Sequence, residues 1–286
     1  MYTSMKNMLL DASKNHYAVM AINCFNIETC RCVINAAEKE DAPIIVNIFK
    51  DHLLTHCESA LIAPVVRYLA DRAKISVALN YDHGSDEKSL LKAIDDGFSS
   101  VMADMSQYPI EENIKRTRSI ADYAHSKGAS IEGEIGSLGQ TEGGNYTGEK
   151  MYTDPDEAKK FFDETNIDAL AISFGSSHGN YPEGKSPEFD FDRLKAIKKK
   201  TGAPLVLHGG SGSGEENIIN AVKYGISKIN VGCDFMNANK NNVMHLLEEN
   251  PDINYFDLIC ESEKESEKLV RYYIGLSGSK GKNKNF

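Results

Sequence analysis

Residues 203–234 read APLVLHGGSGSGEENIINAVKYGISKINVGCD. An apolar segment, a glycine-rich turn and an amphipathic segment are followed by a second apolar segment and a second glycine-containing turn. This order is typical of two parallel strands joined by a crossover helix. The apolar segments do not alternate with polar residues, which is typical of parallel strands covered on both faces. We therefore expect a parallel sheet with helices outside it.

The same alternation continues along the rest of the chain. Eight apolar segments are candidate strands: residues 17–23, 43–48, 75–80, 99–103, 129–135, 168–174, 203–208 and 227–231. The expected helices cover residues 28–41, 61–73, 86–97, 110–128, 189–201, 214–225 and 234–249, and one more begins at 154 and 155. Eight strand–helix units favour an α/β fold with a closed (β/α)8 TIM barrel, although periodicity alone leaves an open doubly wound sheet possible.

The ends of the chain are expected to extend this barrel. We predict one domain over residues 1–286, with a helix before the first strand and a helical extension near residues 262–273. The final segment, about residues 276–286, is rich in Gly, Ser, Lys and Asn and is expected to be a mobile tail.

Composition excludes several classes of protein. The 286 residues are 41% hydrophobic and 26% charged, which is typical of a globular protein and not of a disordered chain or a disulfide-dense miniprotein. A net charge of −10 argues against nucleic acid or an anionic membrane as a partner. The first residues lack the apolar core of a signal peptide, and the six cysteines form no CxxC pair. We expect a cytoplasmic protein with reduced thiols.

Three histidines follow candidate strands, and each is followed by glycine. They are His83, His178 and His208. The carboxyl ends of barrel strands meet at one rim, so we expect these imidazoles to converge. Three imidazoles with an open coordination position suit a catalytic Zn²⁺ ion. The other five histidines are expected to be solvated or structural.

Carboxylates end or occupy several of the same strands. Glu132 and Glu134 share one face of their strand because side chains alternate. We favour Glu134 as an exchanging metal ligand, and Glu132 is equally consistent with a ligand or with an interior carboxylate bonded to Lys. Asp104 ends the fourth strand. Asp82 precedes His83 and reaches the same site only if the strand bends or ends there, so it is an acid or an N-cap.

Two glycine-containing turns predict an anion site. Residues 208–214 precede one helix, and residues 230–234 open the next. Backbone N–H groups at a helix N-terminus bind phosphate, and the loops after strands seven and eight of such barrels commonly do so. An acidic chain can therefore bind a phosphorylated ligand through amides.

At these residues the chain resembles the class II, zinc-dependent ketose-bisphosphate aldolases of the fructose-1,6- and tagatose-1,6-bisphosphate type. The resemblance covers about residues 6–245. The matching segments are NYDHG (80–84), GFSSVMAD (97–104), EENIKRT (111–117), AH (124–125), EGEIGSLG (132–139), YTDPDE (152–157), DALAISFGSSHG (168–179), FDFDRL (189–194), PLVLHGGSG (204–212) and KINVGCD (228–234).

The resemblance implies a homodimer or homotetramer that reversibly cleaves a ketose (bis)phosphate to dihydroxyacetone phosphate and an aldehyde, in carbohydrate metabolism such as glycolysis. It implies Zn²⁺ bound by His83, His178 and His208, with Glu134 as an alternate ligand and Asp104 near a second metal position. Asp82 would exchange the proton of the C4 hydroxyl, and Glu142 would move a proton at the dihydroxyacetone phosphate carbon. The implied substrate-binding residues are Asn23, Gly179, Gly209, Gly210, Ser211, Asn230, Val231, Gly232 and Cys233.

Departures from the family pattern remove most of the groups expected at the distal phosphate, whereas the three histidines and Asp82 are intact and the near-phosphate turns nearly so. Phe49 replaces a small hydroxyl residue, and Cys233 replaces a phosphate-contacting Thr. The other changes are Ile22 for Phe, Pro182 for Lys, Gly143 for Asp, and residues 251–254 where the family has Asp-Pro-Arg. We therefore expect metal-dependent aldol chemistry with an aldehyde that lacks the usual phosphate. The alternatives are another metal-dependent sugar-phosphate lyase or isomerase, and a catalytically weak sugar-phosphate-binding protein.

Overall fold

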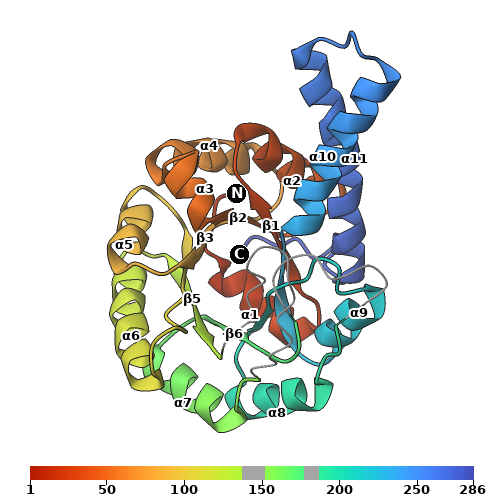
Figure 1. The fold of residues 1–286 in the computed structure, drawn as a ribbon. Helices are drawn as coiled ribbons and strands as arrows, with labels where there is room; N and C mark the ends of the chain where they lie inside the picture. The colour runs from red at the N-terminus through yellow and green to blue at the C-terminus, as the bar shows by residue number, and fades with distance from the viewer. Residues whose placement is uncertain (137–151, 177–186) are drawn as a thin grey trace.

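The computed structural model describes residues 1–136, 152–176 and 187–286, and its described strands form a closed parallel barrel (Figure 1). Each strand pairs with its neighbour in sequence, and β1 pairs with β8, which excludes the open sheet and confirms the TIM barrel. The strands are β1 Val19–Cys24, β2 Ile44–Phe49, β3 Val77–Gly84, β4 Ser100–Ala103, β5 Ser130–Ile135, β6 Ala169–Ile172, β7 Leu205–Leu207 and β8 Ile226–Val231.

Helices surround the barrel, as Figure 1 shows. They are α2 Ile27–Lys39, α3 Lys50–Thr55, α4 Ser59–Arg72, α5 Glu87–Asp95, α6 Ile110–Ser126, α7 Pro155–Thr165, α8 Phe191–Thr201 and α9 Glu215–Lys223. The sequence did not predict α3, because it has only six residues and lies within the connection after β2. Within the described residues, no helix combines the length and apolarity that a membrane span requires.

Local signals explain where several helices begin and end. Asp154 caps α7 by accepting hydrogen bonds from the backbone N–H groups of Asp156 and Glu157, and Pro155 occupies the first turn as expected. Gly202 ends α8 with φ of 65°, a conformation that glycine adopts at little cost.

Three helices lie at the two ends of the chain. α1 (Met5–Asn15) buries Met5, Met8 and Leu9 among the small apolar side chains inside the barrel. At the other end, α10 (Cys233–Glu249) and α11 (Tyr255–Leu276) form a hairpin that projects beyond the barrel (Figure 1). The predicted C-terminal extension is therefore present, and its last helix is longer than residues 262–273.

The C-terminal tail contacts the amino end of the barrel. The Gly281 N–H donates to the Glu40 carbonyl at 2.9 Å, and the Ser76 hydroxyl donates to the Lys284 carbonyl at 2.7 Å. Phe286 packs against the apolar cluster that α1 forms inside the barrel. The mobility expected from the composition of the tail stays a prediction, and these contacts with the amino end of the barrel are what would restrain it.

Candidate active site

A bend at the end of β3 brings two neighbouring side chains into one site. His83 has φ of 55°, and the pairing of β3 with β4 shifts register between Tyr81 and Gly84. Asp82 therefore accepts hydrogen bonds from the side-chain amides of Asn23 at 3.2 Å and Asn230 at 3.1 Å. This bend is the condition under which the sequence allowed Asp82 to reach the site.

His83 and His208 meet at the barrel rim, although they are far apart in sequence. His83 Nε2 lies 3.0 Å from His208 Nδ1, and both side chains are buried. The ligand atoms of Asp82, His83 and His208 lie within 4.8 Å of one another. Glycine is required after His83, because a Cβ at Gly84 would lie 2.3 Å from the side chain of Leu90.

A buried ion pair holds His208 in its orientation. Glu132 Oε1 lies 2.7 Å from His208 Nε2, and Lys228 Nζ donates to Glu132 Oε2 at 2.7 Å. Burial opposes ionisation of Glu132, but Lys228 and the hydrogen bond from His208 overcome it and lower its pKa to about 2. Glu132 is thus an interior carboxylate bonded to Lys. The arrangement leaves His208 Nδ1 facing His83.

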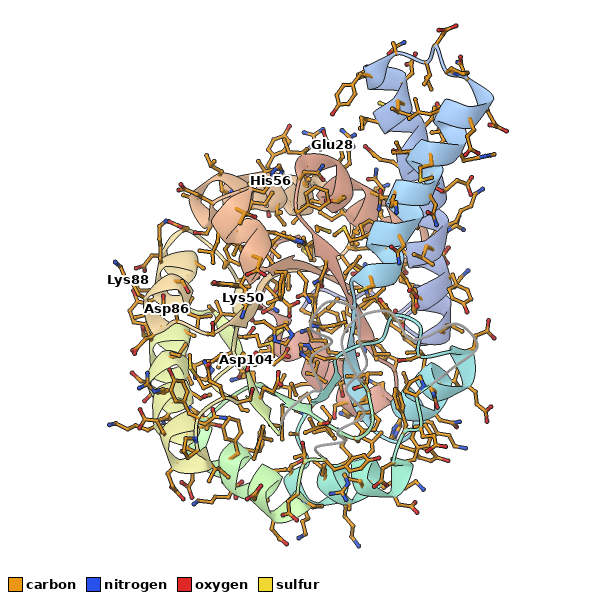
Figure 2. The ribbon with its side chains drawn as sticks, in the orientation of Figure 1. Glu28, Lys50, His56, Asp86, Lys88 and Asp104 are labelled. Atoms are coloured by element: carbon orange, nitrogen blue, oxygen red, sulfur yellow. The ribbon has the colours of Figure 1, made fainter. Side chains whose placement is uncertain are left out.

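A second group of carboxylates faces the other side of His83. Asp104 Oδ2 lies 2.9 Å from His83 Nδ1, and Glu134 Oε2 lies 3.9 Å from the same nitrogen. Figure 2 shows Asp104 near the centre of the barrel opening. Burial, which favours the neutral ring, is outweighed by Asp82, Asp104 and Glu134, and these raise the pKa of His83 to about 9.

The donor set fits a divalent cation. Glu134 is buried, and its Oε2 has no hydrogen-bond partner among the described residues. Burial and the nearby charge of Asp104 raise the pKa of Glu134 well above its usual value. A cation at this position would satisfy the orphaned oxygen and favour the ionised carboxylate. Imidazole nitrogens together with carboxylate oxygens are ligands that Zn²⁺ accepts.

Hydrogen bonds join the two turns that the sequence predicts to bind phosphate. Asp234 accepts a hydrogen bond from the Gly212 N–H at 3.0 Å and another from the Tyr273 hydroxyl of α11. The Ser211 hydroxyl oxygen accepts from the N–H groups of Gly232 and Asp234, each at 3.2 Å. The loops after β7 and β8 are therefore held in one arrangement at the N-terminus of α10.

A cavity of about 340 Å³ opens on Asp82, His83, His208 and the two turns, whereas Asp104 and Glu134 are not among its lining residues. It is lined by Asn23, Phe49, His52, Asp82, His83, His208, Gly209, Ser211, Asn230, Gly232, Cys233, Met236 and Asn237. Most of the predicted site residues in the described ranges therefore share one cavity. Gly210 and Val231 pack behind this lining, since a Cβ at Gly210 would lie 3.4 Å from the Val231 side chain. The predicted residues Glu142, His178 and Gly179 lie outside the described residues.

The sequence missed part of the cavity wall. His52 was expected to be solvated or structural, and it lines the cavity from α3. Met236 and Asn237 line it from the first turns of α10. Only their position in the sequence could have indicated that these three residues line the cavity, because each lies within four residues of a strand end or a predicted loop.

Comparisons with known proteins agree with this geometry. A family model described as fructose-bisphosphate aldolase class-II matches residues 3–282. A 6-phospho-5-dehydro-2-deoxy-D-gluconate aldolase from Bacillus velezensis is 38% identical over 257 residues, which cover 88% of this chain and 87% of that protein. A fructose-bisphosphate aldolase from Staphylococcus aureus is 37% identical over 252 residues, which cover 87% of each chain.

Solved structures show the same relationship in three dimensions. The YdjI aldolase from Escherichia coli K12 superposes with a TM-score of 0.88 at 30% identity and covers 99% of this chain and 100% of that chain. A putative fructose-1,6-biphosphate aldolase from Coccidioides immitis superposes with a TM-score of 0.85 at 28% identity, with 96% of each chain covered. With a family match across nearly the whole chain and a shared barrel, this protein belongs to the class II fructose-bisphosphate aldolase family.

Proposed function

We propose that this aldolase reversibly cleaves a ketose phosphate into dihydroxyacetone phosphate and an aldehyde that carries no phosphate. The observation that carries the proposal is the cavity wall. Among the described residues that line the cavity, none is Lys or Arg, and Phe49 lies beside Asp82 in the sheet. A second phosphate on the substrate would meet an aromatic ring where charge-assisted hydrogen bonds are needed.

The relatives are consistent with either kind of substrate. The name of the Bacillus velezensis relative describes a substrate with one phosphate, and that of the Staphylococcus aureus relative describes a bisphosphate. Their identities to this chain are nearly equal, so the cavity must decide between them. The family match across residues 3–282 does not favour a binding protein or an unrelated lyase or isomerase.

We propose Zn²⁺ as the cofactor, held by His83, His178 and His208, with Glu134 and Asp104 as further ligands. The orphaned Glu134 oxygen and the converging imidazoles of His83 and His208 support this assignment. When bound, the ion supplies a Lewis acid that polarises the substrate carbonyl.

The chain's own residues would move the protons. The two amides of Asn23 and Asn230 orient the Asp82 carboxylate, which takes the proton from the C4 hydroxyl during cleavage and returns it during condensation. The proton exchange at the dihydroxyacetone phosphate carbon stays assigned to Glu142 as a prediction.

We assign the phosphate of dihydroxyacetone phosphate to the turns after β7 and β8. Gly209, Ser211, Gly232 and Cys233 line the cavity there, at the N-terminus of α10. Backbone N–H groups in such turns hold a phosphate without a lysine. The hydrogen bonds of Asp234 to Gly212 and Tyr273 would keep the two turns in register.

Substrate kinetics test the proposal. We expect the kcat/KM for fructose 1-phosphate to exceed that for fructose 1,6-bisphosphate or tagatose 1,6-bisphosphate. Each missing charge-assisted contact to phosphate typically costs about 1.5–3 kcal/mol, or roughly 10- to 150-fold. Phe49→Ser should raise the kcat/KM for the bisphosphates and narrow this gap. The proposal is wrong if the wild-type enzyme uses either bisphosphate more efficiently than fructose 1-phosphate.

We also propose a homodimer or homotetramer in the cytoplasm. The projecting α10–α11 hairpin leaves Met244, Leu247, Tyr255 and Phe256 between 41% and 78% exposed, and exposed apolar side chains that cluster in this way often mark an interface. All six cysteines lie in the described part of the chain and none takes part in a disulfide, as in a reducing compartment. A monomeric mass by light scattering would contradict the assembly.

A further inference from the structure

A row of aromatic rings begins at the histidine cluster, follows the cavity lining through Phe49 and His52, and continues beyond it. The ring centroids of His83 and Phe49 are 6.0 Å apart, and those of Phe49 and His52 are 5.8 Å apart. The row continues through Phe25, 5.7 Å from His52, to His56, a further 5.6 Å away. Figure 2 shows His56 among the helices that surround the barrel, away from its centre. All four contacts are edge-to-face, so the rings form a continuous surface.

His52 is the polar member of this row that lines the cavity without belonging to the histidine cluster. Its Nδ1 is buried and has no hydrogen-bond partner among the described residues. The rings of Phe25 and Phe49 pack on His52 with their edges. A buried N–H without a partner is rarer than a buried acceptor without one, so the neutral ring favours a proton on Nε2. Because the ring lines the cavity and Nδ1 is the buried nitrogen, Nε2 is the ring nitrogen left to bond a ligand there.

The position of His52 relative to the reacting atoms follows from the sheet. Phe49 pairs with Asp82 in the register of β2 and β3, and its ring contacts His83. If Asp82 exchanges the C4 hydroxyl proton, Phe49 lies beside the reacting carbons, and His52, whose ring contacts Phe49, is the next polar side chain of this row in the cavity lining. One uncharged N–H suits a single hydroxyl, whereas a phosphate requires several donors or a cation.

We propose that His52 determines specificity by donating a hydrogen bond to the terminal hydroxyl of a short, unphosphorylated hydroxyaldehyde. This inference rests on the proposed function, because it places the aldehyde product of that reaction against the β2–α3 wall. Phe49 from β2 and Met236 from α10 supply apolar lining of the same cavity for the carbon chain. The aldehyde class is therefore a short hydroxyaldehyde with a hydroxyl on its terminal carbon.

The test is aldol addition by the metal-loaded enzyme. Dihydroxyacetone phosphate is combined with glyceraldehyde or with 2-hydroxypropanal of the same configuration, two aldehydes that differ only in the terminal hydroxyl. The wild type should prefer glyceraldehyde in kcat/KM by about fivefold or more, the usual effect of one hydrogen bond. His52→Phe should lower the value for glyceraldehyde to that for 2-hydroxypropanal, which itself should change by less than about twofold.

Two further variants separate recognition from packing. His52→Gln keeps an N–H donor and should retain part of the preference for glyceraldehyde. His56→Phe changes the outer end of the row. His56 is not one of the described residues that line the cavity, so the preference for glyceraldehyde should be unchanged.

The results distinguish a failure of the role of His52 from a failure of the proposed function. If His52→Phe lowers both values equally, or if the wild type shows no preference, the inference is wrong although the aldolase assignment stands. If neither aldehyde reacts while glyceraldehyde 3-phosphate does, the proposed function and this inference both fail.

Discussion

Replacing Lys228 with Met should destabilise the barrel because it removes one partner of a buried ion pair. Lys228 and Glu132 are both 0% exposed, and Lys228 Nζ lies 2.7 Å from Glu132 Oε2. Met resembles the aliphatic part of Lys in size, so the change removes the charge and leaves little cavity. The variant leaves the Glu132 carboxylate buried with His208 still hydrogen-bonded to it.

The magnitude follows from the burial of both groups. Removing one partner of a buried pair typically costs about 3–5 kcal/mol, because the other charge is left uncompensated. Burial alone would raise the pKa of Glu132, whereas Lys228 and His208 lower it to about 2. We therefore expect Lys228→Met to lose about 3–5 kcal/mol of the free energy of unfolding, from a Glu132 carboxylate that either stays ionised without its partner or takes up a proton. Glu132→Gln combined with Lys228→Met removes both charges and should recover at least half of that loss.

The assay is urea unfolding of the metal-free proteins at pH 7. The chain has no Trp, so far-UV circular dichroism is the appropriate signal. A double-mutant cycle then gives the coupling between Glu132 and Lys228. The reasoning is refuted if Lys228→Met alone loses less than about 1 kcal/mol, or if the double variant loses as much as the two single variants together.

Three further predictions follow from the site and the tail. Asp82→Ala should abolish aldol cleavage while metal content and dihydroxyacetone phosphate binding persist; an unaffected kcat would remove Asp82 from the mechanism. Despite burial, Asp82, Asp104 and Glu134 raise the pKa of His83 from its usual 6.5 to about 9. The protonated imidazole therefore stabilises the metal-free fold fully below about pH 6.5, and this stabilisation is lost as the pH rises through 9. Zn²⁺ added to the metal-free protein at pH 7 should therefore release at least about one proton per ion, measured with an indicator dye in weak buffer; no release would contradict a charged His83. Deleting residues 280–286 removes the hydrogen bonds of the tail to residues 40, 41 and 76 and should lower the thermal midpoint by roughly 5 °C, and an unchanged midpoint would show that the tail does not stabilise the barrel.

The order of the elements is predictable from hydropathy along the chain. Eight apolar segments alternate with amphipathic ones, and this pattern reflects strands buried on both faces and helices buried on one. Because parallel strand ends converge in a barrel whatever side chains they carry, His83, His208 and the turns at 208–214 and 230–234 could be placed at one rim from their positions alone. Element boundaries shifted by a few residues, because hydrogen bonds and caps set them rather than hydropathy.

Other features depend on contacts between distant segments. Glu132 could have been a metal ligand or an interior carboxylate, and only the fold shows Lys228 beside it. Asp82 shares the site with His83 because the chain bends there to a positive φ. His52 lines the cavity because the short α3 packs its ring against Phe25 and Phe49.

The sequence by itself therefore determined the barrel, the family and the rim on which the chemistry lies, since these depend on periodic burial and on residues near strand ends. The tertiary structure decided which way each polar side chain faces and which partner pairs with its charge or hydrogen-bonding groups. The same physical reason applies to the tail, whose composition favours solvent but whose hydrogen-bond partners at Glu40 and Ser76 come from elsewhere in the chain. No local pattern encodes such a partner, because it is supplied by the closure of the barrel.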